Sequence, residues 1–395
     1  MKQEIIDKIN QLASQEEPFL FVINYQGDKA FIRQLSDINP EECLFDFEGR
    51  RNFPEAKNEN LKENISEEIS EKENYSETTW QIEPPLYDDY ERSFNIVKSN
   101  IWAGNSYLTN LTCKVPVSCN LSLESIFHRA KGKYKLLLRK TKIQTEEEAH
   151  LTEDKVHLKK EEEVQNKAHL KEDKAHLKKE EEVQNKAHLK EENMEENLNP
   201  FVCFSPETFV RIKGGRIYSY PMKGTLDASL PDAEKQLMED EKEAAEHATI
   251  VDLIRNDLSR VAEDVRVDKY RYIDVLHTNK GDILQTSSEI SGRLPEDCRN
   301  HLGEILAAQL PAGSITGAPK AKTMQIIHEA EGYDRGFYTG IMGIYDQGEL
   351  NSAVMIRYIE EDENRLFFKA GGGITSKSDC RKEYEEVIQK IYLPF

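Results

Sequence analysis

Alternation of apolar and polar residues around a glycine pair constrains the fold of this chain more than any other feature. The alternation runs through FSPETFVRIKGGRIYSYP (204–221), on both sides of Gly214 and Gly215. A period of two residues is typical of strands, and a glycine pair permits the tight turn of a hairpin. FLFVINYQGDKAFI (19–32) and the stretch 338–374 show the same pattern. The sequence therefore predicts several antiparallel hairpins.

Helices are predicted between these hairpins. Apolar residues at helical spacing occur at 87–101, at 232–256 and in SKSDCRKEYEEVIQKIY (376–392), and APKAKTMQIIHEAEG is rich in helix formers. Hairpins with interspersed helices, and no strand–helix–strand repeat, indicate an α+β fold on antiparallel sheets. We expect a strand-rich N-terminal subdomain at 1–84, packed on a core at 85–395 that is long enough to bury a sizeable interior.

A charged repeat interrupts the predicted core. KKEEEVQNKAHLKE occurs at 159–172 and again at 178–191, and the stretch from about 145 to 198 is composed mainly of Glu, Lys, Asn, Gln and His. Such a composition cannot bury a core, so we interpret it as a helical or disordered low-complexity insertion. Its histidines never form an HxxxH pair, and replication of a short unit explains them better than a metal site. Residues 55–79, also polar, are predicted to be a linker or surface loop.

The overall charge excludes some partners. The chain has a net charge of −20 and a pI of about 5.1, whereas non-specific nucleic-acid binding depends on basic patches. Its six scattered cysteines form no CxxC pair and fit a reducing compartment. We find no signal peptide and no apolar run near the roughly 18 residues of a membrane span. We therefore expect a cytoplasmic protein with neither a nucleic-acid nor a membrane partner.

Two pairs of glutamates are candidates for a cation site. Glu243 and Glu246 lie three residues apart in one predicted helix, and Glu383 and Glu386 repeat that spacing in the last one. Residues three apart share a helix face. If the two pairs faced each other, they would repel unless a cation lay between them, and Mg²⁺ prefers such oxygen ligands. In a chain with 73 acidic residues, a solvated helix surface explains the spacing equally simply.

Two glycine-containing stretches are candidates for anion binding. PAGSITGAPK (311–320) precedes a predicted helix, where Ser314 or Thr316 could act as the N-cap and free N–H groups could bind an anion. KAGGGI (369–374) permits close approach of backbone amides to a carboxylate. Arg357, in VMIRYI, could bind a carboxylate through two hydrogen bonds. Structural turns and a surface arginine remain the alternatives.

Lys223 and Glu207 are the candidate reactive residues. In YPMKGT, Lys223 is predicted to lie just past a strand end, in a tight turn made possible by Gly224. Glu207, in SPETF, lies one strand earlier, so the two side chains could share a pocket. A lysine attacks only as the neutral amine, so burial or nearby cations would have to lower its pKa. A turn lysine paired with an acid is the simpler alternative.

Nine segments of the sequence together resemble one family, the chorismate-utilising enzymes. In chain order they are NSYLTNLT, SPETF, YPMKGT, EAAEHATIVDLIRNDLSRVA, PAGSITGAPKAKTM, YTGIMG, VMIRY, KAGGGI and EYEEV. Their order and spacing resemble the family's across about residues 85–395, apart from the insertion. The resemblance implies a β-sandwich of antiparallel sheets wrapped by helices, with chorismate bound between the sheets.

Within this family, the residue at position 223 distinguishes two branches. Anthranilate synthases carry alanine there, in P-I-A-G-T, and ammonia attacks chorismate at C2. The first component of aminodeoxychorismate synthase carries P-I-K-G-T, which PMKGT resembles. In that branch the lysine is proposed to attack C2 and expel the C4 hydroxyl, after which ammonia adds at C4. The resemblance thus implies that Lys223 is the nucleophile and that Glu207 protonates the departing hydroxyl.

The remaining roles are implied by position in the resembling motifs. The implied Mg²⁺ ligands are Glu246 and Glu386, with Glu243 and Glu383 bound through water. The implied substrate-binding residues are Arg357, Tyr338, Gly371, Gly372, Gly373, Lys390, Thr316 and Gly317. One departure is Gln285-Thr-Ser-Ser, where many relatives have His-Leu-Val-Ser; it bears on ring positioning and not on the class of reaction.

The resemblance also implies a partner. No cysteine lies in a nucleophile-elbow setting with its own His and Glu partners, so we expect a separate glutamine amidotransferase subunit to supply ammonia. Two alternatives lie within the family: anthranilate synthase component I, and an isochorismate- or salicylate-forming enzyme that uses water. A third is a non-catalytic scaffold whose functional part is the repeat, although Lys223, Glu207 and the four glutamates argue against it.

Overall fold

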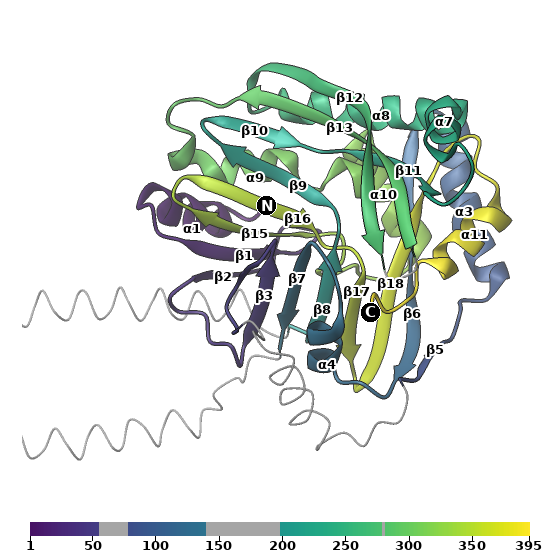
Figure 1. Cartoon of the computed structure of the whole chain (residues 1–395), viewed down its shortest axis with the longest axis horizontal. Helices are drawn as coiled ribbons and strands as arrows, with labels where there is room; N and C mark the ends of the chain where they lie inside the picture. Colours follow the sequence, from purple (N-terminus) through teal and green to yellow (C-terminus); the bar gives the residue numbers. More distant parts are fainter. Residues whose placement is uncertain (55–77, 140–197, 279–280) are drawn as a thin grey trace, which may run out of the picture. The chain divides into compact units, whose positions relative to one another are not determined.

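The structure, a computed structural model, describes residues 1–54, 78–139, 198–278 and 281–395. The predicted insertion at about 145–198 and the predicted linker at 55–79 fall almost entirely outside these ranges. Residues 1–139 and 199–395 form one compact unit, drawn in colour in Figure 1. None of the helices in the described ranges combines the length and apolarity needed to cross a bilayer.

Two antiparallel sheets form the framework of the unit (Figure 1), which confirms the predicted α+β fold. The first sheet has the order β11 (Met222–Asp227), β13 (Gly281–Arg293), β10 (Arg216–Ser219), β9 (Thr208–Lys213), β16 (Glu349–Val354), β15 (Ile341–Asp346), β1 (Phe19–Ile23) and β2 (Ala30–Gln34), and β12 (Glu263–Thr278) also pairs with β13. The second has the order β14 (Gly317–Ala318), β6 (Leu108–Cys119), β18 (Arg365–Ile374), β17 (Tyr358–Asp362), β8 (Phe201–Ser205), β7 (Tyr134–Leu138), β3 (Cys43–Phe47) and β4 (Arg50–Arg51), and β5 (Trp80–Ile82) also pairs with β6.

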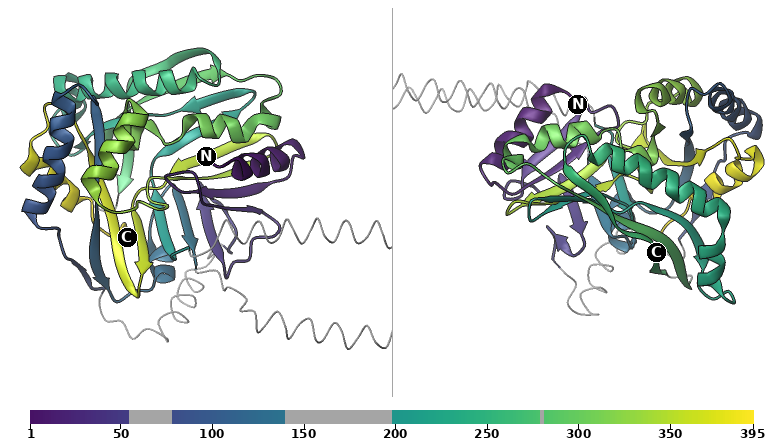
Figure 2. Two further views of the ribbon diagram at one scale, coloured as in Figure 1. Left: turned by 180° about the vertical axis from the view of Figure 1, so that it is seen from behind. Right: turned by 90° about the horizontal axis from the view of Figure 1, so that it is seen from above.

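Four helices cover one face of the second sheet (Figure 2): α3 (Tyr87–Trp102), α4 (Leu123–Arg129), α10 (Lys320–Glu331) and α11 (Cys380–Gln389). Strand alternation places Val115 and Val117 of β6 and Phe368 of β18 on this face, where they pack with Phe94 and Val97 of α3. These side chains are almost fully buried. The predicted helices at 87–101 and in APKAKTMQIIHEAEG are therefore confirmed.

The predicted helix at 232–256 is wrong as a single element. The structure has α7 (Ala233–Glu239) and α8 (Glu241–Leu258), separated at Asp240, which has an extended backbone. The Asp240 side chain accepts a hydrogen bond of 2.9 Å from the backbone N–H of Glu243, so it caps the second helix. The last helix also begins later than predicted, because Asp379 caps it by accepting from Lys382 N–H at 3.1 Å.

The chain passes between the two sheets at neighbouring places. Between β8 and β9 it crosses at Glu207, and between β16 and β17 it crosses at Arg357. Val354 N–H donates to the Glu207 carbonyl at 3.2 Å, and Phe204 N–H donates to the Arg357 carbonyl at 3.1 Å. The crossings thereby satisfy each other's backbone groups and place a glutamate beside an arginine.

The N-terminal helix α1 (Gln3–Ser14) packs against α9 (Leu302–Gln309). Ile5 and Ile9, one turn apart, are fully buried. The approach is close, because a Cβ on Gly303 would lie 2.4 Å from the Ile6 carbonyl oxygen. An apolar stripe therefore attaches α1 to the rest of the unit.

Ile9→Ala should lower the free energy of unfolding by about 2–4 kcal/mol, because it leaves a cavity under α1. Glu4→Ala, on the exposed face of the same helix, should change it by less than about 0.5 kcal/mol. Denaturant unfolding of both variants checks this. Equal effects would show that the buried stripe does not hold the helix.

Candidate active site

Lys223 lies within an edge strand and not in the predicted turn. On β11 it pairs with Thr286 of β13, while Thr225 pairs with Gln285, and the register shifts between the two pairs. The residue between them, Gly224, has a positive φ of 73°. A glycine in this conformation is typical of a β-bulge, which changes the direction of the neighbouring side chain, here that of Lys223. The prediction of a glycine-dependent local bend was right, but the bend lies inside a strand.

Lys223 forms an ion pair with the first predicted metal ligand. Its Nζ lies 2.8 Å from Glu246 Oε2, and a third of its side chain is exposed. Burial lowers the pKa of the Lys223 amine, but the charge and hydrogen bond of Glu246 raise it more, so its pKa lies above the ordinary value. In this state the amine is protonated and cannot attack an electrophile.

Helix α8 brings two of its glutamates to this lysine. The Asp240 cap fixes the first turn, and Glu243 and Glu246 follow on one face. A Cβ on Gly224 would lie 3.0 Å from Glu243 Oε2, so the close approach of helix and strand requires glycine. Burial, followed by the like charge of Glu246, raises the pKa of Glu243. A carboxylate in such a place favours a nearby cation.

Helix α11 supplies the second pair of glutamates. A Cβ on Gly372 would lie 3.5 Å from Glu383 Oε2 and 4.0 Å from Glu386 Oε1, so both acids face the glycine stretch. Lys390 Nζ lies 2.8 Å from Glu386 Oε1 and donates to the Gly371 carbonyl at 3.0 Å. Burial, followed by the charge of Glu386, raises the pKa of Glu383. Lys390 thus ties the helix to the strand.

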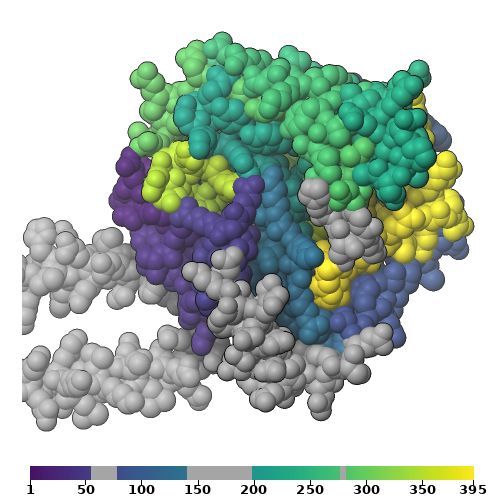
Figure 3. Space-filling model, viewed as in Figure 1, coloured from purple at the N-terminus to yellow at the C-terminus, as the bar shows by residue number. Residues whose placement is uncertain are grey.

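The glutamates of α8 and α11 lie within the influence of the same lysine side chains. The charge of Lys223 acts on Glu386 as well as on Glu243, and that of Lys242 acts on Glu383. Figure 3 shows the teal residues around α7 meeting the yellow residues of the C-terminal part at the surface. Carboxylate oxygens are the donors that Mg²⁺ prefers. Among the described residues, however, no three His, Cys, Asp or Glu side chains lie close enough to hold one metal ion, so the ligand set stays a prediction.

Beyond Lys369, one edge of the glycine stretch has no strand partner among the described residues. Gly371, Gly372 and Gly373 of β18 pair with β6, whereas the pairing with β17 ends at Lys369. A Cβ on Gly371 would lie 2.5 Å from the Leu111 carbonyl oxygen, so this glycine is needed for sheet packing. Gly372 faces Glu383 and Glu386 of α11 and Lys390, the residue that follows this helix. Backbone groups on the unpaired edge can serve a ligand.

Glu207 and Arg357 form a second cluster at the sheet crossings. Ser314 Oγ donates a hydrogen bond of 2.6 Å to Glu207 Oε1. Burial raises the pKa of Glu207, and the hydroxyl of Ser314 and the charge of Arg357 lower it in part. The Arg357 guanidinium lies 5.7 Å from the Tyr392 ring centre and has no carboxylate partner closer than 4 Å within the described ranges. A raised pKa suits an acid, and an unpaired guanidinium suits a carboxylate ligand.

Three other predicted site residues are buried in the framework. Thr316 is fully buried, and its carbonyl accepts from Asn110 N–H at 2.9 Å. Gly317 pairs with β6, and a Cβ there would lie 1.8 Å from the Leu108 carbonyl oxygen. Tyr338 is 3 % exposed, and burial raises the pKa of its hydroxyl. The structure gives Thr316 and Gly317 packing contacts, whereas the ring of Tyr338 lies 6.0 Å from that of Tyr358 near Arg357.

Sequence reasoning missed or misassigned several residues of the site. Ser314 and Thr316 do not cap α10, whose N-cap is Pro319 without a side-chain cap bond; Ser314 instead contacts Glu207. His247, next to Glu246, is fully buried, with Nε2 2.6 Å from Ser288 Oγ and a pKa lowered to about 4 by burial, Arg271 and Lys223. The position of His247 directly after Glu246 in the sequence is the signal that could have identified it.

The two clusters are separate in this structure. Within the described ranges, Glu207 and Lys223 share no hydrogen bond or ion pair. The C-terminal segment connects the clusters, because Lys390 contacts Glu386 and the glycine stretch while Tyr392, two residues on, lies beside Arg357. Gln285, which pairs with Thr225 next to the Lys223–Thr286 pair, has a buried Oε1 without a hydrogen-bond partner in the described part of the chain.

Comparison with known proteins identifies the family. The model for chorismate binding enzymes matches residues 154–394. The chain belongs to this family. A Haemophilus influenzae protein named "Uncharacterized PabA-like protein" is 41% identical over 392 residues, covering 99% of this chain and 97% of the relative. "Aminodeoxychorismate synthase component 1" of Klebsiella aerogenes is 36% identical over 196 residues, 47% of this chain and 42% of the relative.

Solved structures agree with the fold. MenF, the menaquinone-specific isochorismate synthase of Escherichia coli, matches with a TM-score of 0.56 at 16% identity, covering 97% of this chain and 89% of that one. This likeness concerns the fold alone. It agrees with the two antiparallel sheets and their helices, and with the family resemblance of the nine sequence segments. Membership in the family of chorismate binding enzymes rests on the family match and not on this likeness of fold.

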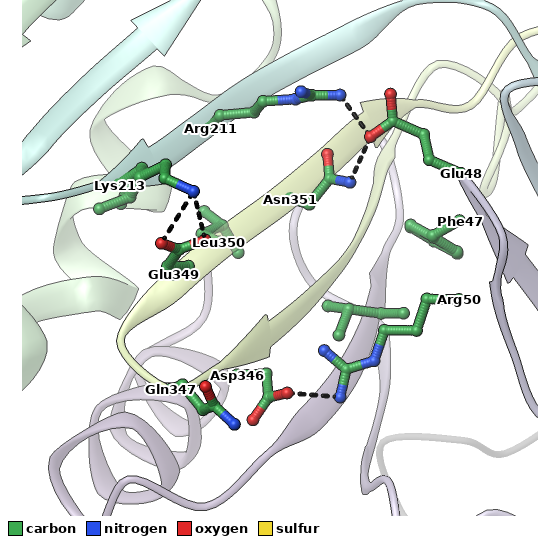
Figure 4. Close-up of a pocket in the computed structure, with 12 residues that line it drawn as sticks. Phe47, Glu48, Arg50, Arg211, Lys213, Asp346, Gln347, Glu349, Leu350 and Asn351 are labelled. Atoms are coloured by element: carbon green, nitrogen blue, oxygen red, sulfur yellow. Dashed lines mark hydrogen bonds and ion pairs between the residues drawn. The ribbon is translucent and has the colours of Figure 1, made fainter.

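A surface cavity of about 450 Å³ shares no residue with either cluster (Figure 4). Its charged side chains pair with one another: Arg50 lies 2.7 Å from Asp346, Lys213 lies 3.2 Å from Glu349, and Arg211 contacts Glu48. Each charge lining this cavity is therefore already compensated. The chemistry of the chain is better sought at the two clusters, whose charges are not all paired.

Glu207→Gln should stabilise the protein by a few degrees at about pH 8 and much less at about pH 4.5. Because the pKa of Glu207 is raised in the folded state, stability is lost as pH rises from the unfolded value of about 4.3 through the folded one. Glutamine does not ionise, so the variant keeps the stability that the parent loses when Glu207 ionises. Melting temperatures across this pH range check it, with the exposed Glu41→Gln as control. A pH-independent difference would refute the raised pKa.

Proposed function

We propose that this chain is component I of an aminodeoxychorismate synthase, which converts chorismate and ammonia to 4-amino-4-deoxychorismate, a precursor of 4-aminobenzoate and folate. The observation that carries the proposal is Lys223, held by a bulge among the glutamates of α8 and α11. A lysine at this position is what separates the 4-aminating branch from anthranilate synthases in the resembling motif. The partial similarity to the Klebsiella aerogenes protein is compatible with this branch, but the branch is assigned on Lys223 and not on overall similarity.

Both clusters have a role in the first step of the proposed reaction. The neutral amine of Lys223 would attack C2 of chorismate as the C4–oxygen bond breaks, and Glu207 would donate its proton to the departing hydroxyl, which leaves as water. Ammonia would then form a bond at C4, and the C2–nitrogen bond to Lys223 would break to release the amine. Arg357 and the free edge at Gly372 would bind carboxylate groups of the substrate.

The ion pair of Lys223 must open before the attack. Glu246 holds the amine protonated in this structure, so the lysine becomes a nucleophile only when that carboxylate is otherwise neutralised. We propose that Glu246 and Glu386 bind Mg²⁺ directly and that Glu243 and Glu383 bind it through water. When bound, Mg²⁺ would neutralise these carboxylates and orient the ring carboxylate of chorismate. Ammonia would come from a separate glutamine amidotransferase subunit.

Product identification tests the proposal. The purified chain is incubated with chorismate, Mg²⁺ and ammonium, and the products are identified by chromatography and mass. A 4-amino product that an added lyase converts to 4-aminobenzoate is expected. Anthranilate or isochorismate would refute the proposed branch and assign Lys223 as a base or a bystander.

Lys223→Ala should leave the fold intact and lower the rate of 4-amination at least about a hundredfold, because alanine cannot attack C2. The control is Lys213→Ala, whose side chain is 72% exposed. Rates and products of both variants are compared with those of the unsubstituted chain. Unchanged rate and product would exclude Lys223 as the nucleophile.

Glu246→Gln should raise the Mg²⁺ concentration needed for half-maximal rate by about tenfold or more, because it removes one charged ligand. Glu241→Gln, an exposed residue in the first turn of the same helix, is the matched control. Calorimetric titration with Mg²⁺ provides a readout that does not depend on turnover. The same Mg²⁺ affinity in both variants would count against Glu246 as a ligand.

A further inference from the structure

A buried ion pair lies behind the glycine stretch and the Ser314 loop. The side chains of Glu331, at the end of α10, and Arg335 are each only 1% exposed, with Arg335 Nη2 2.5 Å from Glu331 Oε1 and Nε 2.8 Å from Oε2. Removing two charges from water is unfavourable unless their remaining donors and acceptors are also satisfied. The contacts of this pair therefore indicate what it holds in place.

All five N–H groups of Arg335 have an acceptor. Two donate to Glu331 as described. Nη2 also donates to the Asn110 carbonyl at 2.7 Å, and Nη1 donates to the Ile315 carbonyl at 3.1 Å and to Thr339 Oγ1 at 3.3 Å. One planar group thus joins β6, the loop before α10 and the segment that carries Tyr338.

Glu331, the other member of the ion pair, also contacts β6. Thr112 donates to Glu331 Oε1 from its backbone N–H at 2.8 Å and from its hydroxyl at 2.9 Å. Thr112 is the β6 partner of Gly371. The ion pair therefore fixes the part of β6 on which the glycine stretch is registered.

The Ile315 carbonyl links the pair to the acid of the site. It accepts from Arg335 and also from Asn110 Nδ2 at 2.9 Å. The preceding residue is Ser314, whose hydroxyl donates to Glu207. Since Ile315 is buried, water is a poor substitute for these two donors. A displacement of Ile315 would pull Ser314 away from Glu207.

We infer that Arg335 is a positioning residue for the reaction: it holds Ser314 against Glu207 and registers the glycine stretch on β6, while touching no reacting atom itself. The reaction concerned is the proposed one, so the inference rests on the proposed function for its catalytic consequence. Replacement of a buried ion pair by well-packed apolar residues is often neutral or stabilising, so stability alone does not account for this pair. What the guanidinium adds is a set of directed hydrogen bonds to the carbonyls of Ile315 and Asn110.

The test compares Arg335→Lys, Ser314→Ala and the double variant. Lysine keeps a positive charge beside Glu331 but cannot reproduce the planar fork that reaches both carbonyls. Arg293→Lys, at a surface arginine paired with Glu263, is the matched control. The rate of chorismate consumption is measured against pH, whatever the product, so a different product would refute the proposed function without affecting this test.

The expected result has two parts. Glu207 is faced by the Ser314 hydroxyl and the Arg357 guanidinium, and loss of the hydroxyl's hydrogen bond removes a group that stabilises the carboxylate. The alkaline limb of the pH–rate profile should therefore move to higher pH in Ser314→Ala and in Arg335→Lys, with kcat/KM lowered about threefold to tenfold. The double variant should be no more impaired than Arg335→Lys alone, because Ser314→Ala removes only the contact with Glu207 that the arginine substitution already weakens.

A second readout requires no turnover. The difference in melting temperature between Glu207→Gln and its parent is measured at about pH 8 in the Arg335→Lys background. It should exceed the same difference in the unsubstituted background, because Glu207 has lost a stabilising donor. If Arg335→Lys does not fold, Asn110→Ala removes the other donor to the Ile315 carbonyl and should shift the same limb. The inference would be overturned by an alkaline limb of the pH–rate profile that does not move. An unchanged melting-temperature difference, or additive effects of the two substitutions on kcat/KM, would also overturn it.

Discussion

The candidate site depends on a paired crossing of the chain between two sheets. A strand that leaves a sheet exposes backbone groups that would otherwise lose their partners. Here the crossing at Glu207 and the crossing at Arg357 satisfy each other's groups through Val354 and Phe204. The arrangement places an acid of raised pKa beside an arginine without a carboxylate partner. Both properties follow from the position of the residues at the junction of the sheets.

Charge compensation organises the other cluster. Four glutamates on α8 and α11 approach β11 and β18 closely, at positions where Gly224 and Gly372 leave room for them. Lys223 and Lys390 now neutralise part of this charge. Any process that frees the Lys223 amine must supply another positive charge to Glu246, since an uncompensated cluster of carboxylates is unfavourable. The proposed nucleophile and the proposed metal ligands are therefore electrostatically coupled.

Local patterns were sufficient for much of the fold. The hairpin around Gly214 and Gly215 and the helices at 87–101 and 320–331 depend on neighbouring residues, and all are present. The break in the predicted helix at 232–256 depends on whether Asp240 caps or continues a helix, which helix propensity alone does not decide. The turn assigned to Lys223 was wrong because a glycine with positive φ also occurs in a bulge, and only the pairing with β13 distinguishes the two.

The sequence by itself determined the class of fold, the spacing of the glutamates on their helices and the residue types that resemble the chorismate-utilising family. These depend on periodicity and on the order of motifs along one chain. Only the tertiary structure decided that Lys223 is paired with Glu246, that Ser314 serves Glu207 and not a helix cap, and that Arg335 joins β6 to the loop before α10. Each of these is a contact between residues that are distant in sequence, and its distance and desolvation are set by packing that no local pattern contains.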